Sequence, residues 1–151
     1  MSTTAIKDLY QQVIVDHSKR PRNCRRLEGA DRQVEGYNPL CGDKITLYLK
    51  LDNGIVKDIS FEGSGCAIST ASASLLTESL KGKSLADAEA LFESFHRLVT
   101  GLEPSHEAPK LGKLAVFSGV CDYPTRVKCA TLAWHTLRAA IRGDEERVST
   151  E

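Results

Sequence analysis

The stretch CGDKITLYLKLDNGIVKDISFEGSGC, residues 41–66, decides the fold of this chain. Apolar residues alternate with other residues over 45–51, which is the period of a strand with one buried face. Asn53 and Gly54 follow, and this pair accepts the positive φ angles of a tight hairpin turn. Residues 55–63 then return as the partner strand. The stretch therefore predicts an antiparallel β-hairpin.

Helical periodicity appears on both sides of this hairpin. The predicted helices are one that ends after Lys19 and before Pro21, one from Ile68 to Ser79 closed by Gly82, one over 85–99 capped by Ser84 and Asp87, a short one near Leu114 and Ala115, and a last one opened by Pro124. A short edge strand is expected near Val34. The predicted fold class is α+β, a small antiparallel sheet of about three strands with helices packed on one side.

Composition indicates one domain over 1–151, because single domains commonly contain about 100–200 residues. Lys+Arg and Asp+Glu number 20 each, so no net charge favours nucleic acid or an anionic membrane as a partner. No apolar run approaches the roughly 18–20 residues that cross a bilayer. The first residues lack the basic region and apolar stretch of a signal peptide, so we expect a cytoplasmic protein.

The cysteines carry most of the chemical information. They stand at positions 24, 41, 66, 121 and 129. In a reducing compartment a disulfide framework is not expected, which favours metal binding or thiol chemistry. Cys41 enters the first hairpin strand and Cys66 follows the second. Because paired antiparallel strands bring these two ends together, the two thiols are predicted neighbours.

Two further residues extend this pair into a candidate metal site. Cys66 and Cys129 lie near predicted helix starts, where unpaired N–H groups favour a thiolate. Asp43 stands two residues after Cys41 and so faces the same side of the strand. Together the four residues Cys41, Asp43, Cys66 and Cys129 make a Cys₃Asp set, whose sulfurs favour zinc or iron–sulfur chemistry. A carboxylate among sulfurs is expected to be the exchangeable ligand.

The alternative for each cysteine is a structural role as a small apolar side chain buried in the core. Cys24 and Cys121 have no obvious metal partner at useful spacing, and we favour this alternative for both. The chain contains no HExxH, GxSxG, P-loop or HxE…PCxxC motif, so the common hydrolase and deaminase classes lack support.

Several ordered segments resemble the SufU-type members of the IscU-like (NifU N-terminal-like) iron–sulfur cluster assembly family. The matching segments are YQQVIVDHSKRPRN (10–23), GYNPLCGDKITLYLKL (36–51), FEGSGCAISTASASLL (61–76), LAVFSGV (114–120) and PTRVKCATLAW (124–134). The resemblance runs from end to end and implies the IscU-like fold.

The resemblance also implies a zinc site on Cys41, Asp43, Cys66 and Cys129 and a role in receiving sulfur from a cysteine desulfurase, here of the SufS type. Lys128 precedes the third cysteine, where IscU-type scaffolds carry a histidine. The stretch between Cys66 and Cys129 is longer than in those scaffolds. Both features resemble the SufU branch and favour sulfur relay to a downstream scaffold or apo-protein.

The leading hypothesis is a zinc-dependent sulfur acceptor that works as the sulfur-transfer partner of a desulfurase rather than as a stand-alone enzyme. Docking would displace one zinc ligand and free Cys41 to take the persulfide sulfur. Arg126 and Lys128 would offset the negative charge of the site or, alternatively, be solvated surface charges. Asp16, His17 and Arg22 match the family near the amino terminus and are candidates for a docking surface. For His17 we favour the alternative of a hydrogen bond at the end of the helix.

Two alternatives remain open from the sequence. The first is a scaffold that assembles a [2Fe–2S] cluster, or transiently binds iron, on the same four residues and transfers the cluster. The second is a structural zinc module that only mediates interaction.

Overall fold

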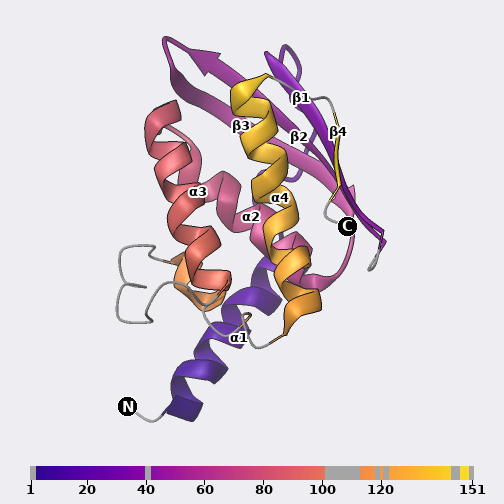
Figure 1. Cartoon of the computed structure of the whole chain (residues 1–151), viewed down its shortest axis with the longest axis vertical. Helices are drawn as coiled ribbons and strands as arrows, with labels where there is room; N and C mark the ends of the chain where they lie inside the picture. The colour runs from indigo at the N-terminus through magenta and orange to yellow at the C-terminus, as the bar shows by residue number, and fades with distance from the viewer. Residues whose placement is uncertain are drawn as a thin grey trace.

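The computed structural model describes residues 3–39, 42–100, 113–117, 120, 123–143 and 147–149, with the backbone alone for 3–10 and 147–149. The elements follow the order α1 (Thr3–Lys19), β1 (Arg32–Asn38), β2 (Asp43–Asp52), β3 (Ile55–Ser64), α2 (Ala67–Leu80), α3 (Leu85–Val99), α4 (Pro124–Arg142) and β4 (Arg147–Ser149). A 3₁₀ helix over 113–117 occupies the place of the predicted short helix. Figure 1 shows the helices gathered on the sheet.

The predicted hairpin forms the centre of the sheet. β2 and β3 pair antiparallel, with Leu47 opposite Phe61. The turn residues Asn53 and Gly54 have φ angles of 51° and 76°, the left-handed region expected for this turn. β1 adds an antiparallel strand on the other side of β2, so the strand predicted near Val34 is confirmed. Contrary to the expectation, it is not the edge of the sheet, because β4 pairs with its outer side.

β4 is a strand that the sequence pattern did not predict. It pairs parallel with β1, and the sheet order is β3-β2-β1-β4. Its three residues are too few to show a two-residue alternation, because a period needs several repeats to be recognised.

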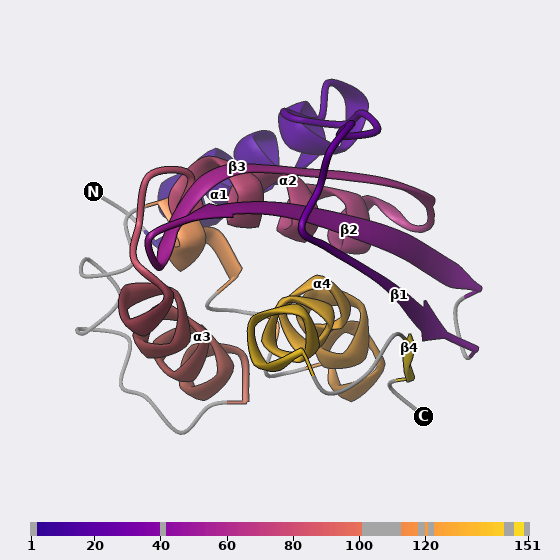
Figure 2. The ribbon, with the colours of Figure 1, turned by 90° about the horizontal axis from the view of Figure 1, so that it is seen from above.

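One layer of helices lies against the sheet, which confirms the predicted fold class. Figure 2 shows α3 and α4 on one side of the strands. α2 and α4 contact strands directly, while α3 packs on α4 and α1 packs on α2. Trp134 of α4 and Phe95 of α3 stack with ring centroids 4.5 Å apart inside this layer. Of the helices that the structure describes, none has the length and apolar character to cross a membrane.

α2 is buried over most of its surface and not along a single stripe. Every residue from Ala71 to Thr77 is buried. Its polar side chains are paired: the Ser72 hydroxyl donates to the Ala130 carbonyl oxygen at 2.5 Å and accepts from the Trp134 indole N–H at 3.1 Å. Buried polar groups are tolerated when they are hydrogen-bonded in this way, so α2 is the central helix of the domain.

The segment between α1 and β1 covers the opposite face of the sheet. It begins beside β3, where the Asn23 carbonyl oxygen accepts from the Phe61 N–H at 3.0 Å, and ends where the Asp31 N–H donates to the Leu49 carbonyl oxygen at 2.8 Å. Leu27 within it is buried. Figure 2 shows this segment above the strands. The predicted loop therefore covers the face of the sheet opposite to α3 and α4.

Gly36 allows α4 to approach β1 closely. A Cβ at this position would lie 2.1 Å from the Thr136 hydroxyl oxygen and 2.9 Å from a methyl group of Ile45. Real Cβ atoms do not approach other atoms so closely. The absent side chain thus seats α4 on the strand that ends at Asn38, next to the candidate site.

Candidate metal centre

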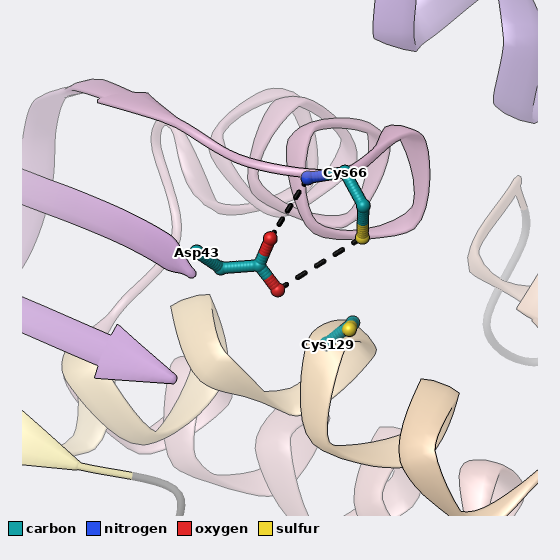
Figure 3. Close-up of side chains that lie close together, drawn as sticks. All are labelled: Asp43, Cys66 and Cys129. Carbon is teal, nitrogen blue, oxygen red and sulfur yellow. Dashed lines mark hydrogen bonds between the residues drawn. The ribbon is translucent and has the colours of Figure 1, made fainter. Parts of the chain in front are cut away.

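Three of the four predicted ligands meet at one end of the sheet. Asp43 begins β2, Cys66 precedes α2 and Cys129 lies in α4, so three separate elements supply them. Figure 3 shows the three side chains pointing toward one another. One ligand atom from each lies within 4.8 Å of the other two. Within the part of the chain that the structure describes, this is the one group of His, Cys, Asp or Glu side chains close enough to hold a metal ion.

The Asp43 carboxylate is fully buried and held from the side of Cys66. Its Oδ1 accepts from the Cys66 backbone N–H at 2.8 Å, and its Oδ2 lies 3.9 Å from the Cys66 sulfur (Figure 3). Gly65 makes room for it, because a Cβ there would lie 2.6 Å from Oδ1. The sequence suggested an exchangeable carboxylate, whereas this burial and hydrogen bonding favour a fixed one.

Cys66 is the N-cap of α2, as its position in the sequence predicted. Its Sγ accepts from the Ser69 N–H at 3.4 Å. An N-cap side chain satisfies one of the unpaired amide groups of a helix start. A thiolate is the stronger acceptor at such a position, since the helix dipole favours negative charge there.

Cys129 is held differently from Cys66. It is the sixth residue of α4 (Pro124–Arg142), beyond the four N–H groups that a helix start leaves unpaired. The helix-start argument therefore does not extend to it. Its sulfur, which is fully buried, instead accepts from the Asn38 side-chain amide, with Nδ2 3.6 Å from Sγ.

Asn38 is the site residue that sequence reasoning missed. It ends β1 directly opposite Asp43 in the strand pairing and is fully buried. Its position opposite Asp43 could have identified it, but this position depends on the register between β1 and β2. The sequence of β1 alone does not determine that register.

The remaining predicted site residues are placed as follows. Cys41 and Cys121 lie outside the described residues. Cys24 is exposed, so the expectation of a buried side chain was wrong for it: it lies on the segment beside β3, apart from the candidate site. Partial desolvation and the nearby Glu62 raise the pKa of its thiol. Arg126 is exposed and Lys128 half-buried, both just before Cys129 in α4.

His17 makes a hydrogen bond at the end of α1, as favoured from the sequence, and is not part of a docking surface. Its side chain is 2% exposed, and Nδ1 lies 2.7 Å from the Ser74 hydroxyl oxygen of α2. Burial lowers the pKa of His17, which favours the neutral ring. Asp16 is exposed and Arg22 is half-buried, and the two pair with each other at 2.8 Å. The pair and the histidine together attach the end of α1 to the domain.

The donor set fits a thiophilic metal ion. A tetrahedral ion with bonds of about 2.3 Å to sulfur separates its ligand atoms by about 3.8 Å. The group within 4.8 Å reaches this spacing with small side-chain movements. Two sulfurs and one carboxylate oxygen favour zinc or iron–sulfur chemistry over magnesium or calcium, which prefer oxygen alone.

The fold and this site define an α+β domain with a buried candidate metal centre at one end of its sheet. The chain belongs to the NifU-like N-terminal domain family, whose family model matches residues 9–130.

Named relatives agree with this assignment. The chain is 42% identical over 142 residues to the iron–sulfur cluster assembly scaffold protein IscU of Streptococcus pyogenes serotype M1, covering 94% of this chain and 88% of that protein. It is 43% identical over 137 residues to the zinc-dependent sulfurtransferase SufU of Bacillus subtilis (strain 168), covering 91% and 92%. A crystal structure of a candidate scaffold protein for the SUF system, from Fervidobacterium islandicum AW-1, superposes with a TM-score of 0.82 at 36% identity, covering 93% of this chain and 99% of that one.

Proposed function

We propose that this protein is a zinc-dependent sulfur acceptor that takes persulfide sulfur from a cysteine desulfurase. The observation that carries the proposal is the buried group of Asp43, Cys66 and Cys129, with ligand atoms within 4.8 Å of one another. Cys41 would complete the set of four ligands. Zinc bound there would keep the cysteines deprotonated at neutral pH. The similarity to a protein named zinc-dependent sulfurtransferase supports the choice of metal.

The chain's own part in the transfer is to supply one thiolate. In the proposed step the Cys41 thiolate attacks the terminal sulfur of the desulfurase persulfide. A new S–S bond forms to Cys41, the S–S bond of the donor breaks, and the desulfurase cysteine leaves as a thiolate. The proton on the terminal sulfur stays with it, so the exchange needs no outside oxidant or reductant.

Cys41 is the proposed acceptor because the other two thiols are held by the protein. Cys66 caps α2 and Cys129 is fully buried in α4. The attacking thiolate must reach a sulfur atom on another protein, and burial of a side chain prevents this. Arg126 and Lys128, close in sequence to Cys129, are proposed to offset the negative charge of the site.

A persulfide assay tests the proposal directly. The purified protein is incubated with a SufS-type cysteine desulfurase and cysteine, and mass spectrometry locates any added sulfur. We expect a gain of one sulfur at Cys41, about one zinc per chain, and faster desulfurase turnover that Cys41→Ala abolishes. Unchanged turnover enhancement by Cys41→Ala would refute the assignment of the acceptor, and Cys24→Ala is the matched control for an exposed thiol outside the site.

A second function is supported by the name of the Streptococcus pyogenes relative, which is called a scaffold. On this alternative the same ligands would assemble an iron–sulfur cluster as cargo. Anaerobic reconstitution separates the two functions. A stable cluster that passes to an apo-protein favours the scaffold, whereas a persulfide without a stable cluster favours sulfur relay.

A further inference from the structure

We propose that Asn38 is a positioning residue for the metal centre, with its side-chain amide orienting both Asp43 and Cys129. The inference rests on the proposed function, because it concerns how the ligands of that site are held. Asn38 is fully buried at the end of β1, where the strand pairing sets it opposite Asp43 and the packing of α4 on β1 brings Cys129 near.

The amide nitrogen of Asn38 faces both ligands. Nδ2 lies 3.5 Å from Asp43 Oδ2 and 3.6 Å from Cys129 Sγ. An asparagine amide carries two N–H groups, so it can donate to the carboxylate and to the sulfur at once. Such bonds strengthen when the acceptor is ionised, which is the state in which both residues bind a metal.

The orientation of this amide is determined by the same contacts. Turning the side chain over would set its carbonyl oxygen against a carboxylate oxygen and a sulfur, which are both acceptors. In the orientation observed, the Asn38 Oδ1 is buried and has no hydrogen-bond partner among the described residues. An unpaired buried carbonyl costs free energy. The contacts of Nδ2 with Asp43 and Cys129 therefore compensate for the free-energy cost of burying Oδ1.

A purely structural role explains the amide poorly. A leucine has nearly the same shape as asparagine, and replacing a buried polar group by an apolar one can be neutral or stabilising. With an oxygen that has no partner among the described residues and with two long contacts from its nitrogen, Asn38 is expected to contribute little to the metal-free fold. Its donor geometry becomes useful only when Asp43 and Cys129 are charged and must stay in place.

The experiment measures metal affinity and metal-free stability separately. We would compare the full chain with Asn38→Leu and Asn38→Ala. Ser60→Ala is the matched control, since Ser60 is also fully buried in the sheet, at β3, and its hydroxyl also lacks a partner among the described residues. Zinc affinity is read by competition with a chromophoric chelator, ligand geometry by the absorption spectrum of the cobalt-substituted protein, and stability by urea unfolding without metal.

We expect both Asn38 variants to bind zinc about 10- to 100-fold more weakly, as loss of a group that orients metal ligands typically does. Their cobalt spectra should change, while Ser60→Ala keeps both properties. Stability without metal should be retained in Asn38→Leu. Asn38→Ala, which adds no bulk, decides the matter if Asn38→Leu does not fold.

Three results would overturn the inference. One is wild-type zinc affinity with an unchanged cobalt spectrum in the Asn38 variants. Another is an equal loss in Ser60→Ala, and the third is unfolding of both Asn38 variants without metal, which would assign a structural role. Failure of the wild-type chain to bind zinc would instead overturn the proposed function itself.

Discussion

Replacing Gly65 by alanine should displace the Asp43 carboxylate while leaving the fold intact. The new Cβ would lie 2.6 Å from Asp43 Oδ1, so that oxygen has to move about 0.8 Å to reach ordinary contact at 3.4 Å. Moving it this far from the Cys66 N–H, now at 2.8 Å, lengthens the hydrogen bond beyond its normal range. The φ angle of Gly65 is not in the left-handed region, so the backbone itself accepts alanine.

The size of the effect follows from the bond that is lost. Hydrogen bonds to charged groups contribute about 1.5–3 kcal/mol. If the Asp43 carboxylate must hold this bond in order to bind zinc, Gly65→Ala should weaken zinc affinity by about 10- to 150-fold, since 1.4 kcal/mol corresponds to a factor of ten. The loss should appear in metal affinity because the bond aligns a ligand.

Chelator competition would measure the affinity, and thermal unfolding without metal would report on the fold. Ser64→Ala, at the exposed neighbouring position, is the control and should keep wild-type affinity. Wild-type zinc affinity in Gly65→Ala would refute the reasoning, because it would mean that the carboxylate position does not matter to the site. So would an equal loss in the control.

Three further predictions concern the helices and the carboxylate. Burial lowers the pKa of His17 in the folded protein, whereas in the unfolded chain the imidazole keeps its ordinary pKa of about 6.5. As the pH falls from 7.5 to 5.5 the unfolded chain therefore binds a proton that the folded chain does not, and the free energy of unfolding without metal should decrease in urea titrations. His17→Gln should reduce that decrease. Trp134→Phe removes the N–H that donates to Ser72 and some buried volume, and should cost about 1–3 kcal/mol in the same titration; a cost below about 0.5 kcal/mol would contradict this account. Asp43→Ala should speed zinc loss in a chelator assay, because the carboxylate is buried and anchored; slower loss would show that it is the exchangeable ligand.

The hairpin could be predicted from the sequence because its signals are local. The alternation along β2 and the positive φ angles of Asn53 and Gly54 are properties of neighbouring residues. The meeting of Asp43 with Cys66 then follows, since antiparallel pairing fixes which strand ends are adjacent. This half of the site needed no knowledge of the rest of the fold.

The other half of the site depends on tertiary packing. Nothing in the periodicity of α4 determines that Cys129 rests beside β1, because the close approach at Gly36 is what sets it there. The residue facing Cys129 was consequently missed. The burial of Ser72 and Ser74 in α2 is likewise not readable from the sequence, because it depends on hydrogen bonds from distant residues.

The Ser72 hydroxyl has a consequence for the register of the two helices that carry Cys66 and Cys129. It joins α2 to α4 by donating to the carbonyl oxygen of Ala130, the residue after Cys129. Cys66 is the N-cap of α2, six residues before Ser72. Sliding one helix along the other would change the separation of the two sulfurs, but it would also break this buried bond. The register of the two helices that carry the cysteines is therefore held by a bond that does not involve the ligands themselves. Adjustment to a bound ion is then left to the side chains, whose ligand atoms already lie within 4.8 Å of one another.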